Sequence, residues 1–141
     1  MKIREREAGG AVVLVPDSDI TWRNQPTLRQ VLDRLSERGR THIIIDLSNV
    51  EEISGYGLGL LASRCGRLRR RAGDIRLANP SALIKRILEM TSLDELFEQY
   101  TDIDQAVRSF AIVHTGKEPG PNENGPKEKQ ETCESRVRSK R

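Results

Sequence analysis

Residues 43–61 read IIIDLSNVEEISGYGLGLL, and within this stretch the sequence changes from a strand pattern to a helix pattern. Three β-branched residues in a row are typical of a strand that is covered on both faces, as in a parallel sheet. After the polar passage, the apolar face of a predicted helix consists of Leu58, Leu61, Ala62, Cys65 and Leu68. Between the two patterns, residues 54–57 (SGYG) supply a capping hydroxyl and turn-forming glycines, so we expect function at this loop.

The same two patterns alternate along the rest of the chain. Strands are predicted at residues 2–7, 11–15, 43–46 and 74–78, with a short fifth strand at 96–100. Helices are predicted at residues 26–39, 58–73, 81–93 and 102–110. Strands that alternate with helices indicate an α/β fold with a largely parallel sheet and right-handed crossovers.

Length and composition limit the classes of protein that fit. The chain has 141 residues, enough for one domain, and with only 4% aromatic residues its core must be aliphatic. A net charge of +3 and a pI of about 9.1 do not indicate nucleic-acid binding. Because no apolar run approaches the roughly 20 residues of a membrane span, we expect no membrane insertion and a cytoplasmic location.

The last part of the chain has a different composition. From about His114 onward glycine, proline, asparagine, glutamate and lysine dominate, and Val137 is the only aliphatic residue. Such a segment cannot bury enough apolar surface to order itself. We therefore predict a folded domain over residues 1–113 and a polar, disordered C-terminal tail over residues 114–141.

Three short motifs make the folded part resemble a STAS domain, the fold of bacterial anti-sigma factor antagonists. They are DLSNV at residues 46–50, IS at 53–54 and GLGLL at 57–61. The resemblance implies an α/β, STAS-like fold with a four- to five-stranded mixed sheet and about four helices. It also implies a protein-binding module that is not an enzyme, needs no cofactor, and sequesters an anti-sigma factor or serine-kinase-like regulator to release a sigma factor.

At the motif that relatives use as a switch, this chain departs from the family pattern. In the family, an ATP-dependent anti-sigma kinase phosphorylates the last residue of a triplet, often serine, and the added charge ends binding. Here Ser54, Gly55 and Tyr56 occupy the triplet, so a tyrosine stands at the acceptor position, and Thr21 replaces an aspartate that is common after the second strand. We expect that the usual phosphoserine switch is absent.

The residues expected to bind the partner or to form the phosphorylation loop are Thr21, Asn24, Glu52, Ser54, Gly55, Tyr56 and Gly57. Ser54 is either a helix cap or a phosphoacceptor. Tyr56 is either an exposed anchor for the partner or a ring that packs on the first helical turn. Asp46, at the end of a strand, is either a ligand-binding residue or a carboxylate that closes a turn.

Two other classes of function compete with this interpretation. The altered triplet also fits a STAS scaffold or a transporter-associated STAS subunit that never uses phosphorylation. A small α/β enzyme or nucleotide-binding protein is the third class, because Gly55, Gly57 and Gly59 precede a helix. However, the dinucleotide fingerprint would need glycine at Leu60, no P-loop lysine follows, and neither a nucleophile–base pair nor a metal-ligand spacing is visible.

Overall fold

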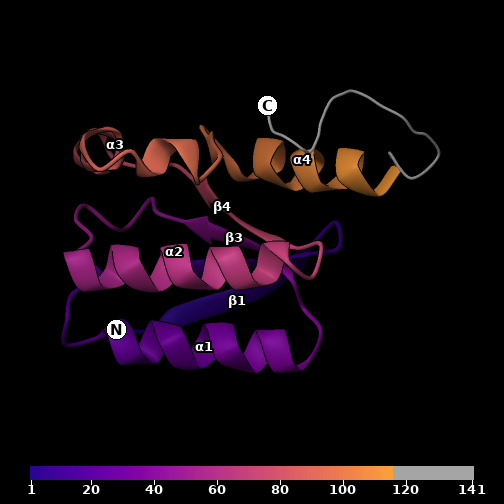
Figure 1. Ribbon diagram of the computed structural model, residues 1–141, viewed down its shortest axis with the longest axis horizontal. Helices are drawn as coiled ribbons and strands as arrows, with labels where there is room; N and C mark the ends of the chain where they lie inside the picture. Colours follow the sequence, from indigo (N-terminus) through magenta and orange to yellow (C-terminus); the bar gives the residue numbers. More distant parts are fainter. Residues whose placement is uncertain (116–141) are drawn as a thin grey trace. The chain divides into compact units, whose positions relative to one another are not determined.

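The computed structural model describes residues 1–115, with side chains described through Phe110. The chain divides after Arg108, and the fold presented here is that of Met1–Arg108. The elements, shown in Figure 1, are β1 (Ile3–Ala8), β2 (Ala11–Pro16), α1 (Gln25–Glu37), β3 (His42–Asp46), α2 (Gly55–Arg69), β4 (Asp74–Ala78), α3 (Ala82–Met90), a 3-10 turn η1 (Leu93–Glu95), β5 (Gln99–Tyr100) and α4 (Ile103–Thr115).

The five strands form one mixed sheet in the order β1-β2-β3-β4-β5. β1 and β2 form an antiparallel hairpin in which Ile3 lies opposite Pro16 and Ala8 opposite Ala11. The turn of this hairpin uses Gly9 and Gly10, both with positive φ, as a two-residue turn with matching twist requires. The remaining neighbours pair in parallel, which confirms the predicted mixed α/β fold.

Two rows of apolar side chains cross the middle of the sheet. Register partners on β2, β3 and β4 form these rows, which are Val12–Ile43–Ile75 and Leu14–Ile45–Leu77. All six side chains belong to one buried core together with side chains of α1, α2 and α3, and α1 and α2 lie side by side (Figure 1). β2 and β3 are buried on both faces, as their unbroken apolar runs predicted, whereas the middle of β1 is exposed.

Several element boundaries differ from the prediction. The fifth strand, predicted over residues 96–100, contains only Gln99–Tyr100, because Leu96 keeps a helical backbone after η1 and only Gln99 and Tyr100 pair with β4. The third helix, predicted to residue 93, ends at Met90. Beyond it the Thr91 hydroxyl donates back to helical carbonyl oxygens, and Ser92 is left-handed.

The other two boundaries concern α2 and α4. The helix predicted over residues 58–73 is α2, which spans Gly55–Arg69. It begins three residues earlier than predicted because Ser54 is its N-cap. α4 extends to Thr115, beyond the predicted residue 110. The predicted disordered tail lies outside the described residues except for its first two, so the domain boundary at residue 113 stays a prediction.

A buried group of charges fixes the start of β4. The Asp74 carboxylate accepts hydrogen bonds from Nε of Arg69 at 2.9 Å and from Nε of Arg76 at 3.0 Å. Burial alone would raise the pKa of the Asp74 carboxyl, but the charges of Arg76 and Arg69 outweigh burial and hold this pKa below its ordinary value. Burial raises the pKa of the Cys65 thiol, which stays protonated and donates to Asp74 at 3.2 Å.

Leu61→Ala and Leu32→Ala should each lower the free energy of unfolding by about 2–5 kcal/mol, because both side chains are buried in the core and truncation leaves a cavity. Leu83→Ala is the matched control. Since Leu83 is 41% exposed, its truncation should cost less than about 1 kcal/mol. Urea unfolding measures all three variants, and equal effects at the three positions would contradict the core assigned here.

Asp74→Asn should lower the free energy of unfolding by about 3–5 kcal/mol at neutral pH, because the buried Arg76 loses its nearest carboxylate and keeps the longer contact with Glu98. The folded-state pKa of Asp74 is lowered, so its stabilisation is complete above the unfolded-state pKa of about 3.9 and is lost as the pH falls through the folded-state pKa. The free energies of unfolding of wild type and of Asp74→Asn should therefore become similar in acid.

The control for this substitution is Asp33→Asn, which removes the carboxylate paired with Arg64; the Asp33 side chain is 43% exposed, against 9% for Asp74. Solvent screens the more exposed pair, so this variant should lose less free energy of unfolding than Asp74→Asn at neutral pH. Urea titrations between pH 7 and pH 2 test both expectations. A constant difference between wild type and Asp74→Asn across this range would show that charge does not cause the effect.

Candidate functional site

The loop before α2 and the connector after β2 form one surface. Ile20 and Ile53 pair as an isolated parallel bridge, although 33 positions separate them. The amide of Ser54 donates to the carbonyl of Ile20 at 2.8 Å, and the amide of Ile20 donates to the carbonyl of Glu52 at 3.1 Å. The structure thus brings together the two segments that the sequence analysis singled out.

The side chain of Asp19 fastens the same two segments. Its Oδ1 accepts a hydrogen bond from the amide of Glu51 at 2.8 Å and a longer one from the amide of Glu52 at 3.3 Å. On the far side of the loop, the Ser81 hydroxyl donates to the carbonyl of Glu51 at 3.0 Å. The loop is therefore held from the connector and from the start of α3, and its backbone groups have partners.

Ser54 is the N-cap of α2. Its backbone is extended, with φ −71° and ψ 165°, and its Oγ accepts a hydrogen bond from the amide of Gly57 at 3.1 Å. This geometry satisfies one of the free amides at the helix start, as expected for a capping serine. Of the two interpretations of Ser54, the structure supports the cap.

Only one of the three glycines in this region is required by packing. A Cβ at Gly57 would lie 2.7 Å from Cγ2 of Ile20 and 2.8 Å from Cγ2 of Ile53, so α2 could not approach the bridge with any larger residue. Gly55 and Gly59 would meet no atom within 4 Å. Close packing of the helix start therefore requires glycine at position 57 and not at positions 55 or 59.

Two large aromatic side chains are exposed on the joined segments. Tyr56 is 71% exposed, so it does not pack back on the first helical turn. Trp22 is 63% exposed, and the guanidinium of Arg23 lies 5.2 Å from the centroid of its ring. Exposed tryptophan and tyrosine are the residues most enriched at the centres of protein interfaces.

Sequence reasoning included the connector that contains Trp22 but did not name this residue, although a signal was present. It is the only tryptophan in the chain, and it lies in a segment without helix or strand periodicity. We define the loop surface as the exposed residues of the two segments, which are Trp22, Arg23, Glu51, Glu52, Gly55 and Tyr56.

Thr21 and Asn24, selected from the sequence, shape the connector and are half-buried. The amide of Thr21 donates to Oδ1 of Asn24 at 2.8 Å, and Nδ2 of Asn24 donates to the carbonyl of Asp19 at 2.8 Å. The side-chain oxygen and nitrogen of Asn24 are thus both bonded within the connector. The two residues therefore present Trp22 and Arg23, which lie between them, to solvent.

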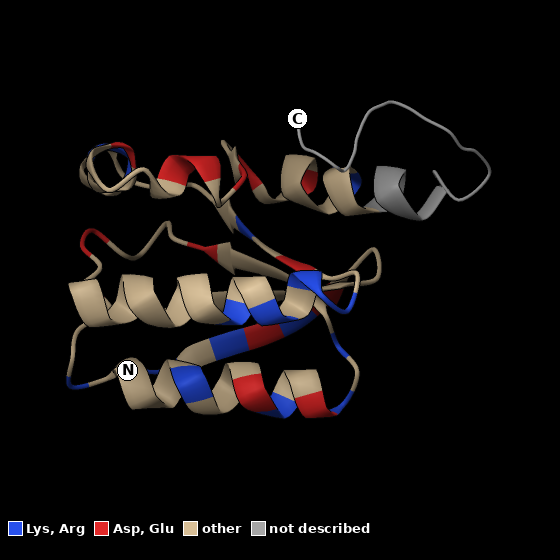
Figure 2. Ribbon diagram, viewed as in Figure 1, with Lys and Arg blue, Asp and Glu red and all other residues tan. Residues whose placement is uncertain are grey.

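The start of α2 carries no charge. Figure 2 shows that its first turns contain neither acidic nor basic residues, and the first charged residue along the helix is Arg64. No acidic side chain compensates the helix dipole in the first turn. An uncharged helix start beside two aromatic rings matches the centre of a protein interface, where charged residues are depleted.

Asp46 closes a turn at the end of β3. Its Oδ1 accepts hydrogen bonds from the amide of Ser48 at 3.0 Å and from Nδ2 of Asn79 at 3.1 Å. This supports the turn-closing interpretation of Asp46.

Within residues 1–115, no three histidine, cysteine or carboxylate side chains gather as metal ligands would. No helix of that same part combines the length and apolarity needed to cross a bilayer.

Comparison with known proteins identifies the family. The STAS domain family matches residues 2–106. A Thermotoga maritima protein, provisionally named an anti-sigma factor antagonist, is 27% identical over 97 residues, which are 68% of this chain and 86% of that protein. An anti-sigma F factor antagonist of Paenibacillus polymyxa is 18% identical over 114 residues, which are 80% of this chain and 97% of that protein.

Solved structures agree in fold. The crystal structure of the Thermotoga protein has a TM-score of 0.72 at 24% identity, covering 76% of this chain and 92% of that one. The anti-sigma factor antagonist SpoIIAA of Bacillus gives TM-scores of 0.57 without and 0.58 with phosphate, at 19% identity. Both SpoIIAA comparisons cover 81% of this chain, and they cover 97% and 99% of SpoIIAA respectively.

Sequence and structure therefore lead to the same family. The anti-sigma factor antagonists of that family are non-enzymatic binding modules, in line with the expectation that this chain is not an enzyme. The match extends over most of the chain, and the mixed five-stranded sheet is the fold of the related structures. This chain belongs to the STAS domain family.

Proposed function

We propose that this chain is an anti-sigma factor antagonist, a module that sequesters an anti-sigma factor or related kinase and so releases a sigma factor. Family membership and the names of its relatives support this role. The observation that carries the proposal is the loop surface, on which Trp22 and Tyr56 are exposed beside an uncharged helix start. The role places the chain in the cytoplasm, without nucleic-acid binding.

The scaffold beneath the loop surface supports docking at a fixed geometry. The bridge between Ile20 and Ile53, the Asp19 carboxylate and the Ser54 cap hold both segments before any partner arrives. A preorganised surface loses less conformational entropy on binding. Aromatic anchors add large contact areas with few rotatable bonds, so a small surface of this kind can bind with useful affinity.

In this proposal serine phosphorylation does not end binding. The acceptor position holds Tyr56, whose hydroxyl projects several ångströms further than that of serine. The hydroxyl of Ser54 already accepts the bond from the Gly57 amide, and the residue is only half-exposed. Binding is then regulated through the partner or through the abundance of this chain.

A second candidate is a STAS scaffold or a transporter-associated STAS subunit. The Ser54-Gly55-Tyr56 triplet favours it, because a scaffold needs no phosphoacceptor. Both candidates use the domain for protein binding, and they differ in the partner. Capture of an anti-sigma factor supports the antagonist, whereas capture of a membrane transporter supports the scaffold.

Trp22→Ala and Tyr56→Ala should each weaken binding to the cognate anti-sigma factor by about tenfold or more, because interface anchors contribute more than about 1–2 kcal/mol. Calorimetry measures the dissociation constants. Met90→Ala is the matched control, since Met90 is 77% exposed on α3 and lies outside the loop surface, and it should bind within about twofold of wild type. If all three variants bind like wild type, docking occurs elsewhere.

Incubation with the cognate anti-sigma kinase and ATP should leave wild type unphosphorylated at Ser54 and Tyr56 and still able to bind. Tyr56→Ser should gain phosphate, because it places a short hydroxyl at a helix N-terminus, where a phosphate is electrostatically favoured. Mass spectrometry locates the phosphate, with Ser54→Ala as the control. Phosphate on wild-type Ser54 that ends binding would mean that the switch has moved two residues.

A further inference from the structure

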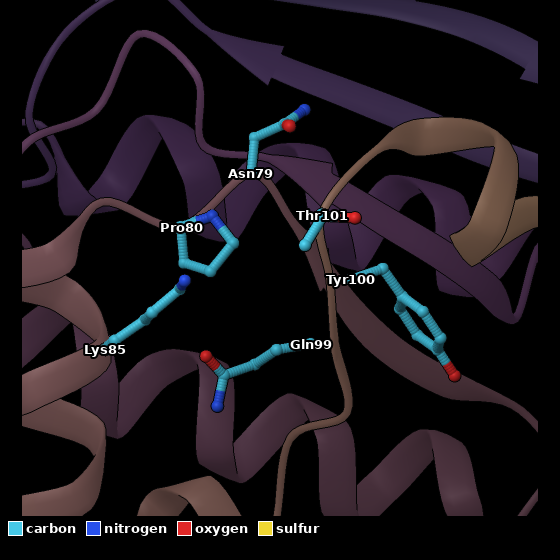
Figure 3. A pocket seen from close by; sticks show the side chains of 6 residues that line it. All are labelled: Asn79, Pro80, Lys85, Gln99, Tyr100 and Thr101. Carbon is cyan, nitrogen blue, oxygen red and sulfur yellow. The ribbon is translucent and has the colours of Figure 1, made fainter.

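A pocket of about 360 Å³ lies at the carboxyl ends of β4 and β5, beside the start of α3. Its lining, shown in Figure 3, consists of Asn79, Pro80, Lys85, Gln99, Tyr100 and Thr101. None of these residues belongs to the loop surface. The volume lies within the range of about 300–1,000 Å³ that is typical of small-molecule sites, and the ends of parallel strands are where such sites gather.

The backbone around this pocket is held in place. Asn79 has φ 57°, a left-handed conformation that persists only where its surroundings determine it. Its amide donates to the carbonyl of Tyr100 at 2.9 Å, and its side chain donates to Asp46 at 3.1 Å. The turn between β4 and α3 is thereby tied to β5 on one side and to the end of β3 on the other.

Two polar side chains extend into the pocket. Figure 3 shows Lys85, from α3, and Gln99, from β5, reaching into it from two sides, with the ring of Pro80 close to the Lys85 ammonium. Tyr100 points away, and its hydroxyl donates to Glu98 at 2.5 Å. The described residues provide neither a hydrogen-bond partner nor an ion-pair partner for the ammonium of Lys85 or the amide of Gln99.

The pocket lining is positively charged, which favours an anionic ligand. Among the described residues that line the pocket, Lys85 is the only charged one, and none is a carboxylate. α3 has no acidic residue in its first turn, so the positive end of its dipole adds to the charge of Lys85. The Thr101 hydroxyl bonds to Gln105 at 3.0 Å, and in Figure 3 its methyl group faces the pocket, so Thr101 and Pro80 provide apolar contact.

We propose that this pocket binds a small organic anion. Its carboxylate or phosphate pairs with the ammonium of Lys85, a polar atom beside that group bonds to the amide of Gln99, and its apolar body rests on Pro80. The ligand contacts none of the residues of the loop surface. The inference therefore stands whether or not the proposed docking role is correct.

Titration of the full ¹⁵N-labelled chain with benzoate, phenyl phosphate and benzamide, followed by amide NMR spectra, tests this site. At least one of the two anions should cause saturable shifts at the amides of Lys85, Gln99 and Thr101. Neutral benzamide, which has the same shape as benzoate, should bind at least about tenfold more weakly, because charge-assisted hydrogen bonds are roughly twice as strong as neutral ones. Comparing benzoate with phenyl phosphate distinguishes a carboxylate site from a phosphate site.

Lys85→Met and Lys85→Gln should each weaken binding of the anion by about tenfold or more. Both remove the charge from an exposed helical position, and a dispersed spectrum verifies the fold. Arg86→Met is the matched control, because Arg86 is the next residue, is also exposed and does not line the pocket. It should bind within about twofold of wild type.

Three results would overturn the inference. These are the absence of saturable shifts with either anion, shifts that map away from the pocket, and binding by both Lys85 variants that equals that of wild type.

Discussion

The parallel pairing of β3 with a strand on each side is the constraint on which the rest of this structure depends. Parallel neighbours cannot be joined by a tight turn, so the chain must cross over between them, and α1 and α2 are these crossovers. Both helices then cover the apolar rows Val12–Ile43–Ile75 and Leu14–Ile45–Leu77. The core and the order of the helices follow from one set of strand pairings.

The same pairing gathers the functional segments. The carboxyl ends of parallel strands lie at the same end of a sheet. The connector after β2, the loop after β3 and the turn after β4 therefore all start there. Asp19, Ser54 and Ser81, one from each segment, then bond to the backbone of the loop region. These bonds hold the candidate loop to the connector and to the turn before α3.

A charged group is buried at the other end of the sheet, where the parallel strands begin. Asp74 begins β4, where α2 has just ended, and its carboxylate binds Arg69 from that helix and Arg76 from its own strand. Desolvation opposes this arrangement, and two arginines and the protonated Cys65 thiol offset it. The cluster joins α2 to the start of β4, because Cys65 and Arg69 of the helix both bond to Asp74 of the strand.

The sequence by itself determined the fold class and the position of the candidate loop. The unbroken run Ile43-Ile44-Ile45 predicted an interior strand, the spacing of Leu58, Leu61 and Cys65 predicted the inward face of α2, and a serine before glycines predicted a cap. These features are local, because backbone preference and side-chain periodicity act over a few residues. That is why the order of the elements and the identity of the family could be read from the chain.

Only the tertiary structure decided how the loop is presented and where several elements end. The bridge between Ile20 and Ile53 and the steric demand for glycine at position 57 depend on contacts between segments about 30 residues apart. The length of β5 depends on its pairing with β4, because Gln99 and Tyr100 lie opposite Leu77 and Ala78, where β4 ends. Contacts of this kind leave no periodic signal in the sequence, because each partner is chosen by the packing of the whole domain.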